Sequence, residues 1–81
     1  MENNIRPIST IAREIADDWK KPYFGAVPYI HAMFCLDKPT DMYGFDDARS
    51  IVTYFLCNAS TWRGEKAKAV KAELKKMFRI W

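Results

Sequence analysis

Residues 46–59, DDARSIVTYFLCNA, decide the fold of this chain because they fit two kinds of secondary structure. The run SIVTYFLC at 50–57 is rich in β-branched and aromatic residues, a composition typical of a buried strand. Apolar residues also repeat through this region at the spacing of one helix face, namely Ala48, Ile51, Val52, Phe55, Leu56 and Ala59. No partner strand is evident, so we expect a helix from about 46 to 58, with Asp46 and Asp47 suited to its start.

The stretch before this run predicts two more helices. Residues 8–20 place isoleucine, alanine and tryptophan side chains on one face and charged side chains on the other, and Pro22 and Gly25 end this helix. Residues 28–36 begin with Pro28, which suits the first turn because its missing N–H would be unpaired there. Hardly any polar face remains on this short segment, so we expect it to be the buried central helix.

The last part of the chain predicts the longest helix, from about 61 to 80. Its apolar stripe consists of Ala67, Val70, Leu74, Met77, Phe78 and Trp81. Ser60 or Thr61 is suited to cap its start. Residues 37–44 are rich in turn-forming residues, so we expect a loop there.

Length and composition bound the fold class. The chain has 81 residues, enough for one domain, and its 49% hydrophobic content argues against a disordered chain. No internal repeat or linker is visible. We therefore expect an all-α fold, a compact bundle of about four helices that forms a single domain over residues 1–81.

Cysteine usage and the first residues predict the compartment. Cys35 and Cys57 both lie in apolar runs, which favours reduced thiols in the core of a cytoplasmic protein over a disulfide framework. Residues 1–10, MENNIRPIST, lack the apolar segment of a secretion signal, and no apolar run is long enough to span a bilayer. We therefore expect a soluble protein with no membrane partner.

Positive charge is concentrated in the last quarter of the chain. Residues 60–81 hold seven basic and two acidic side chains, whereas residues 1–59 hold six basic and eight acidic ones. The predicted last helix carries a continuous basic stripe of Lys68, Lys71, Lys75 and Arg79. Such a stripe suits a phosphate backbone or an acidic protein surface, and the alternative is a solvated face near the negative end of the helix dipole. The stripe contains no interleaved aromatics, which weakens a case for stacking on single strands.

Arg63 is a lone charge on the apolar face of the predicted last helix and needs a partner there. One interpretation is a structural ion pair with Asp17, Asp41 or Asp46, with Trp62 packing beside it. The other is an anion-binding arginine, because the free N–H groups at a helix start attract phosphate or carboxylate.

Aromatic residues make up 15% of the chain, too many for so small a core to enclose. The candidates for exposure lie in loops or at helix ends, namely Tyr23, Phe24, Tyr43, Phe45, Trp62 and Trp81. Closing the core at its edges is one role for them, and an interface hot spot or a base-stacking platform is the other. The surplus of rings also favours self-association, most simply as a symmetric dimer.

The sequence offers little for catalysis or metal binding. His31 and Cys35 are one helical turn apart, and with Cys57 they still leave a tetrahedral metal site one ligand short. A thiol in an apolar helix is also a poor nucleophile. The acidic pairs 17–18 and 46–47 do not converge, because neighbours on a helix point about 100° apart. We therefore expect no catalytic residue, no metal, no cofactor and no enzymatic activity.

Two stretches together resemble a family of small proteins encoded by tailed bacteriophages and prophages. They are IADDWKKPYFGAVPYIHAMF at 15–34 and IVTYFLCNASTWRGEKAKAVKAELKKM at 51–77. The first carries the pattern W…A-x-P-Y-x-x-A-M, and the second carries Y-F-L-x-N-A-x-x-W-R-G. The resemblance covers roughly residues 8–77 and implies a phage setting in the bacterial cytoplasm, but no mechanism.

Three functions follow as hypotheses. The first is a non-enzymatic accessory protein that binds and inhibits a host protein, such as part of a defence system, through an exposed aromatic and basic surface. The second is a sponge for an anionic nucleotide, held by Arg63, the lysines of the last helix and a stacked ring of Tyr23 or Trp62. The third is a nucleic-acid-binding regulator that uses the last helix, although the preceding helices are too apolar for a helix-turn-helix.

Overall fold

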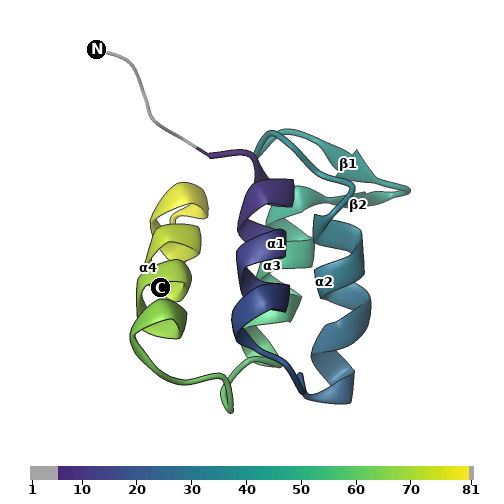
Figure 1. Ribbon diagram of the computed structural model, residues 1–81. Helices are drawn as coiled ribbons and strands as arrows, with labels where there is room; N and C mark the ends of the chain where they lie inside the picture. The colour runs from purple at the N-terminus through teal and green to yellow at the C-terminus, as the bar shows by residue number, and fades with distance from the viewer. Residues whose placement is uncertain (1–5, 81) are drawn as a thin grey trace.

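The structure, a computed structural model, describes residues 6–80 and consists of helices with one short hairpin (Figure 1). In chain order the elements are α1 (Ile8–Asp18), the 3-10 turn η1 (Phe24–Ala26), α2 (Val27–Met33), β1 (Met42–Tyr43), β2 (Asp46–Asp47), α3 (Ala48–Cys57) and α4 (Glu65–Phe78). The expectation of an all-α bundle is therefore correct for the helices, and the hairpin is an addition to it. None of these helices is long and apolar enough to cross a membrane.

The decisive run folds as a helix and not as a strand. α3 buries Ala48, Ile51, Val52 and Phe55, four of the six residues of the predicted stripe, and α1 buries its isoleucines in the same way. The side chain of Asp47 caps α3 by accepting a hydrogen bond of 2.9 Å from the backbone N–H of Ser50. Burial along one face of each helix therefore outweighs the strand preference of the β-branched residues.

The second helix is at the edge of the bundle and not at its centre. α1 and α3 each pack against both α2 and α4, and Figure 1 shows α2 and α4 on opposite sides of them. α2 buries Ile30, Ala32 and Met33, but His31 is exposed. The prediction of a buried central helix over 28–36 is wrong, because the apolar face of this segment is wider than the core it contacts.

The last helix begins at Glu65, four residues later than the earliest predicted start at Thr61. Gly64 precedes it with φ of +110°, a left-handed backbone conformation that side chains disfavour. Residues 58–64 form turns in which Trp62 is only 2% exposed. Ser60 and Thr61 therefore do not cap α4, because the chain must first bury an indole.

A β-hairpin replaces part of the loop expected at 37–44. Met42 pairs with Asp47 and Tyr43 pairs with Asp46, which leaves a two-residue turn of Gly44 and Phe45. Gly44 has φ of +65°, as a type II′ turn requires at its first central position. The hairpin precedes α3 directly and projects from the bundle beside the end of α2 (Figure 1).

Candidate functional site

Trp62, a predicted exposed ring, belongs to the core. Its ring stacks on Trp19 with centroids 5.8 Å apart, and it meets the edge of Phe55 at 6.3 Å. Its Nε1–H donates a hydrogen bond of 2.8 Å to Oδ2 of Asp18. An indole held on these sides is not available to stack on a nucleotide base, which removes one of the rings proposed for the nucleotide sponge.

Arg63 is exposed and lies in the turn before α4, not on the apolar face of that helix. The expected structural ion pair with Asp17, Asp41 or Asp46 does not form within residues 6–80. The prediction of a buried charge fails because it extended the helical projection into residues that are not helical. Arg63 remains a candidate for contact with an anion at the surface.

The basic stripe on α4 is interrupted at Lys71. Its Nζ donates a hydrogen bond of 2.7 Å to the carbonyl oxygen of Trp62 and lies 5.9 Å from the centroid of that ring. Burial lowers the pKa of Lys71, and the nearby charges of Lys75 and Arg63 lower it further. Lys71 therefore supports the turn before α4, whereas Lys68 and Lys75 are exposed on this helix. Arg79 is exposed too, but it follows the end of α4 with φ of +56° and so is not part of the helical stripe.

Several of the predicted aromatic candidates are exposed at the surface. Tyr23 is 46% exposed, Phe24 79%, Tyr43 44% and Phe45 102%. Tyr54 is 51% exposed, although the helical stripe of α3 gave no reason to single it out. Trp81 lies outside the residues that the structure describes.

Four rings form what we call the aromatic seam, defined as Tyr23, Phe24, Tyr29 and Tyr54. The rings of Tyr23 and Phe24 lie 4.8 Å apart, and those of Tyr29 and Tyr54 lie 5.6 Å apart. Gly25 lies beside both Tyr23 and Asn58, because a Cβ there would lie 2.6 Å from Cε2 of Tyr23 and 2.7 Å from Oδ1 of Asn58. Asn58 in turn donates a hydrogen bond to the carbonyl oxygen of Tyr54. The seam thus runs along one side of α2 and onto α3.

The aromatic and basic candidates do not form one surface. The seam lies on η1, α2 and α3, while the exposed lysines lie on α4, which Figure 1 shows on the opposite side of α1 and α3 from α2. α1 and α3 separate the two flanking helices. The two sets therefore lie on different elements, and we describe them as separate surfaces.

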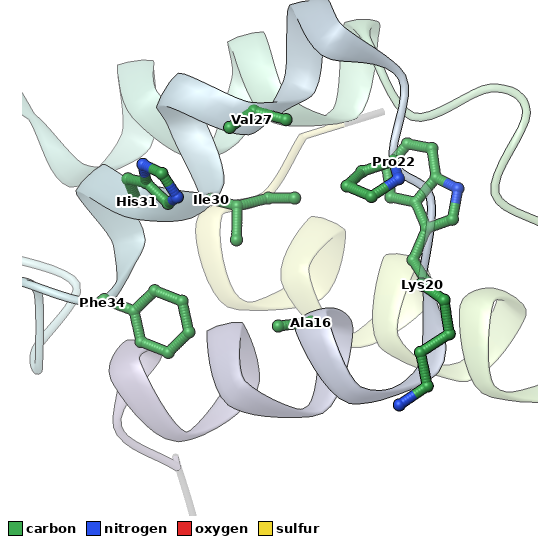
Figure 2. A pocket seen from close by; sticks show the side chains of 8 residues that line it. Ala16, Lys20, Pro22, Val27, Ile30, His31 and Phe34 are labelled. Carbon is green, nitrogen blue, oxygen red and sulfur yellow. The ribbon is translucent and has the colours of Figure 1, made fainter.

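A groove of about 230 Å³ lies on the other side of α2, between α1 and α2. Figure 2 shows Phe34 at one end, Pro22 and Lys20 at the other, and Ala16 and Ile30 between them. Trp19, Val27 and His31 complete the lining. Its walls are mainly apolar, with Lys20 as the one charged side chain in the lining that the structure describes.

Both cysteines are exposed and free, so the prediction of two core thiols is wrong. Cys35 lies just beyond the last residue of α2, and Cys57 is the last residue of α3. Both cysteines therefore lie at or near a helix end, outside the core. Among residues 6–80 no group of three or more histidine, cysteine and acidic side chains converges as a metal site.

No protein-family model matches this chain, and neither a curated protein nor a solved structure is significantly similar to it.

Proposed function

We propose that this chain is a non-enzymatic binding protein that contacts another protein through the aromatic seam. The observation that supports it is the exposure of paired rings, with Phe24 79% exposed against Tyr23 and Tyr54 51% exposed against Tyr29. Large apolar side chains gathered in one exposed area mark interaction surfaces in soluble proteins. Tyrosine is also among the residue types that contribute most to binding energy at protein interfaces.

The seam is organised before any partner arrives. Each ring is packed against a second ring, and Gly25 lies close to both Tyr23 and Asn58. Fewer side-chain rotations are then lost on binding, so more of the contact energy contributes to affinity. Such preorganisation suits a binding surface better than simple closure of the core.

The proposed partner is a protein of the bacterial host. This part of the proposal depends on the resemblance to small phage proteins, and it places the chain in the cytoplasm of an infected or lysogenic cell. Binding would inhibit the partner, for example a component of a defence system, by covering one of its functional surfaces. The proposal requires no catalytic group, metal or cofactor.

The decisive experiment compares seam variants with a matched surface variant. Proteins captured from host lysate by the wild type are identified, and the dissociation constant of each purified candidate is measured by calorimetry. Phe24→Ser and Tyr54→Ser should each weaken binding at least about tenfold, because each removes an exposed ring. Tyr43→Ser removes a similarly exposed ring from the hairpin and should not weaken it. Equal affinity for all four proteins would overturn the proposal.

A second candidate function is nucleic-acid binding through α4. Lys68, Lys75 and Arg79 are exposed, and within the described part of the chain none of them forms an ion pair. Binding through these side chains would release counterions, so the affinity for random-sequence DNA would fall steeply as the salt concentration rises. Absence of binding at low salt would remove this candidate.

A further inference from the structure

The groove between α1 and α2 can accept an apolar side chain that has an acidic residue next to it. Its volume is about 230 Å³, and Ala16, Ile30 and Phe34 supply apolar walls. Lys20 stands at one end of the groove in Figure 2. No carboxylate belongs to the lining that the structure describes. A hollow between α1 and α4 is different in kind, since it is lined by Glu14, Asp17, Asp18 and Lys66.

The tip of the hairpin has the complementary chemistry. Phe45 is 102% exposed, so its ring makes almost no contact with its own chain. The Gly44–Phe45 turn holds the ring at the far end of the two paired strands. Asp46 follows directly and is exposed, whereas the carboxylate of Asp47 is occupied in capping α3.

We propose that the groove binds the hairpin tip of a second copy of this chain. The ring of Phe45 from one copy would fill the apolar groove of the other, and Asp46 would pair with Lys20 at its end. Two copies related by a twofold axis would make this contact twice, which closes the assembly as a dimer. The tip offers an apolar ring next to an acidic residue, and the groove offers apolar walls next to a lysine. The two are therefore complementary in polarity and in charge.

A second copy is favoured over an unrelated partner because both halves of the contact belong to this sequence. Phe45 does not occupy the groove of its own chain, since it is fully exposed. None of the groove or tip residues belongs to the aromatic seam. The dimer and the seam can therefore be tested independently, and failure of one leaves the other standing.

The first test measures mass by sedimentation equilibrium over a range of concentrations. The wild type should rise from the monomer mass of 9.5 kDa towards twice that mass as concentration increases. Phe45→Ser should raise the dimer dissociation constant at least about tenfold. Phe24→Ser removes an exposed ring from the seam and should leave the constant unchanged. A wild type that stays monomeric at every concentration would overturn the proposal.

The second test exchanges the charges. Lys20→Glu and Asp46→Lys should each be monomeric, because each places like charges together in both contacts. An equal mixture of the two variants restores opposite charges in both contacts and should regain the dimer mass. Lys21→Glu makes the same charge change at an exposed neighbour outside the groove and should dimerise like the wild type. A mixture that stays monomeric while the Lys21 variant dimerises would show that this pairing is absent.

Discussion

The indole nitrogen of Trp62 donates a hydrogen bond of 2.8 Å to the carboxylate of Asp18, 44 residues earlier in the chain. Asp18 is the last residue of α1, and Trp62 lies three residues before α4 begins. The bond therefore joins the end of the first helix to the turn that starts the last one. Since the same ring stacks on Trp19, this contact sets where α4 lies against the bundle.

Trp62→Ala should be among the most destabilising single substitutions in this protein. It would empty a site that is 2% exposed and remove the ring that packs against both Trp19 and Phe55. Replacing a buried aromatic by alanine lowers the free energy of unfolding by about 3–5 kcal/mol. Urea unfolding followed by circular dichroism measures this loss.

Asp18→Ala tests the hydrogen bond without emptying the core. Because Asp18 is exposed, water can take the place of its carboxylate beside the indole N–H, and the expected loss in unfolding free energy is about 1 kcal/mol. Tyr43→Ala, at an exposed ring on the hairpin, serves as the control with little change. If Trp62→Ala were as mild as this control, the ring would not be part of the core.

Substitutions of Lys71 and Lys68 should differ in their effect on the free energy of unfolding, although the sequence places both residues on one stripe. Lys71→Ala removes the bond to the carbonyl oxygen of Trp62 and the charge over its ring, so unfolding should become easier by about 1–2 kcal/mol. Lys68→Ala removes an exposed charge and should change stability by less than about 0.5 kcal/mol. Equal effects in urea unfolding would contradict the different roles assigned to these two lysines.

The contrast between these two lysines shows that the spacing of residues along a helix predicts which face they share, but not what each side chain contacts. The apolar stripes of α1 and α3 are strong because several buried residues repeat over adjacent turns, and both helices were predicted correctly. The start of α4 was misplaced because Gly64 and Trp62 act through backbone conformation and a contact distant in sequence. Arg63 was then projected onto a helix face that does not exist at that position.

Hydrophobic periodicity predicts neither the hairpin nor the aromatic seam. Two short strands leave no alternating pattern in sequence, and the Gly44–Phe45 pair is a modest turn signal. Exposure of Tyr23 and Phe24 was predicted from their position between helices. The close approach of Gly25 to Asn58 depends on a contact distant in sequence, which no single stretch encodes.

Both cysteines should react with a thiol reagent in the folded protein. Cys35 and Cys57 are exposed at helix ends, so unfolding is not needed to reach them. Titration with Ellman's reagent in buffer should detect two reactive thiols per chain. If a thiol reacted only after addition of denaturant, that cysteine would be buried as the sequence first indicated.

Acid should weaken the contact that Arg6 makes with α1 and α4. Its guanidinium donates to Glu14 at 2.6 Å and to both carboxylate oxygens of Glu73 at 3.0 and 2.6 Å. The hydrogen bond from Arg6 lowers the pKa of Glu14 below its usual value of 4.5. Stability from a lowered carboxylate pKa is fully present above the usual value and is lost as the pH falls through the lowered one.

Arg6→Met should therefore cost about 1 kcal/mol of unfolding free energy at neutral pH, a value typical of partly exposed ion pairs. The difference from wild type should shrink as the pH falls below 4.5, because Glu14 becomes protonated in both proteins. Urea unfolding at a series of pH values measures this difference. A gap that stays constant down to strong acid would mean that Arg6 acts through its apolar stem alone.

Gly25→Ala should disturb the seam without removing any of its rings. The added Cβ would lie 2.6 Å from Cε2 of Tyr23 and 2.7 Å from Oδ1 of Asn58, closer than real contacts allow. Tyr23 is exposed and can swing away, but Asn58 is held by its bond of 2.9 Å to the carbonyl oxygen of Tyr54. Such crowding typically lowers the unfolding free energy by about 1–3 kcal/mol.

A double-mutant cycle with Asn58→Ala locates the cause of that loss. The second substitution makes room for the new methyl group, so the double variant should lose less stability than the two single variants added together. Partner affinity should also fall in Gly25→Ala, because the spacing between the two ring pairs changes while all four rings remain. Strict additivity in urea unfolding, together with unchanged partner affinity, would show that Gly25 does not set the geometry of the seam.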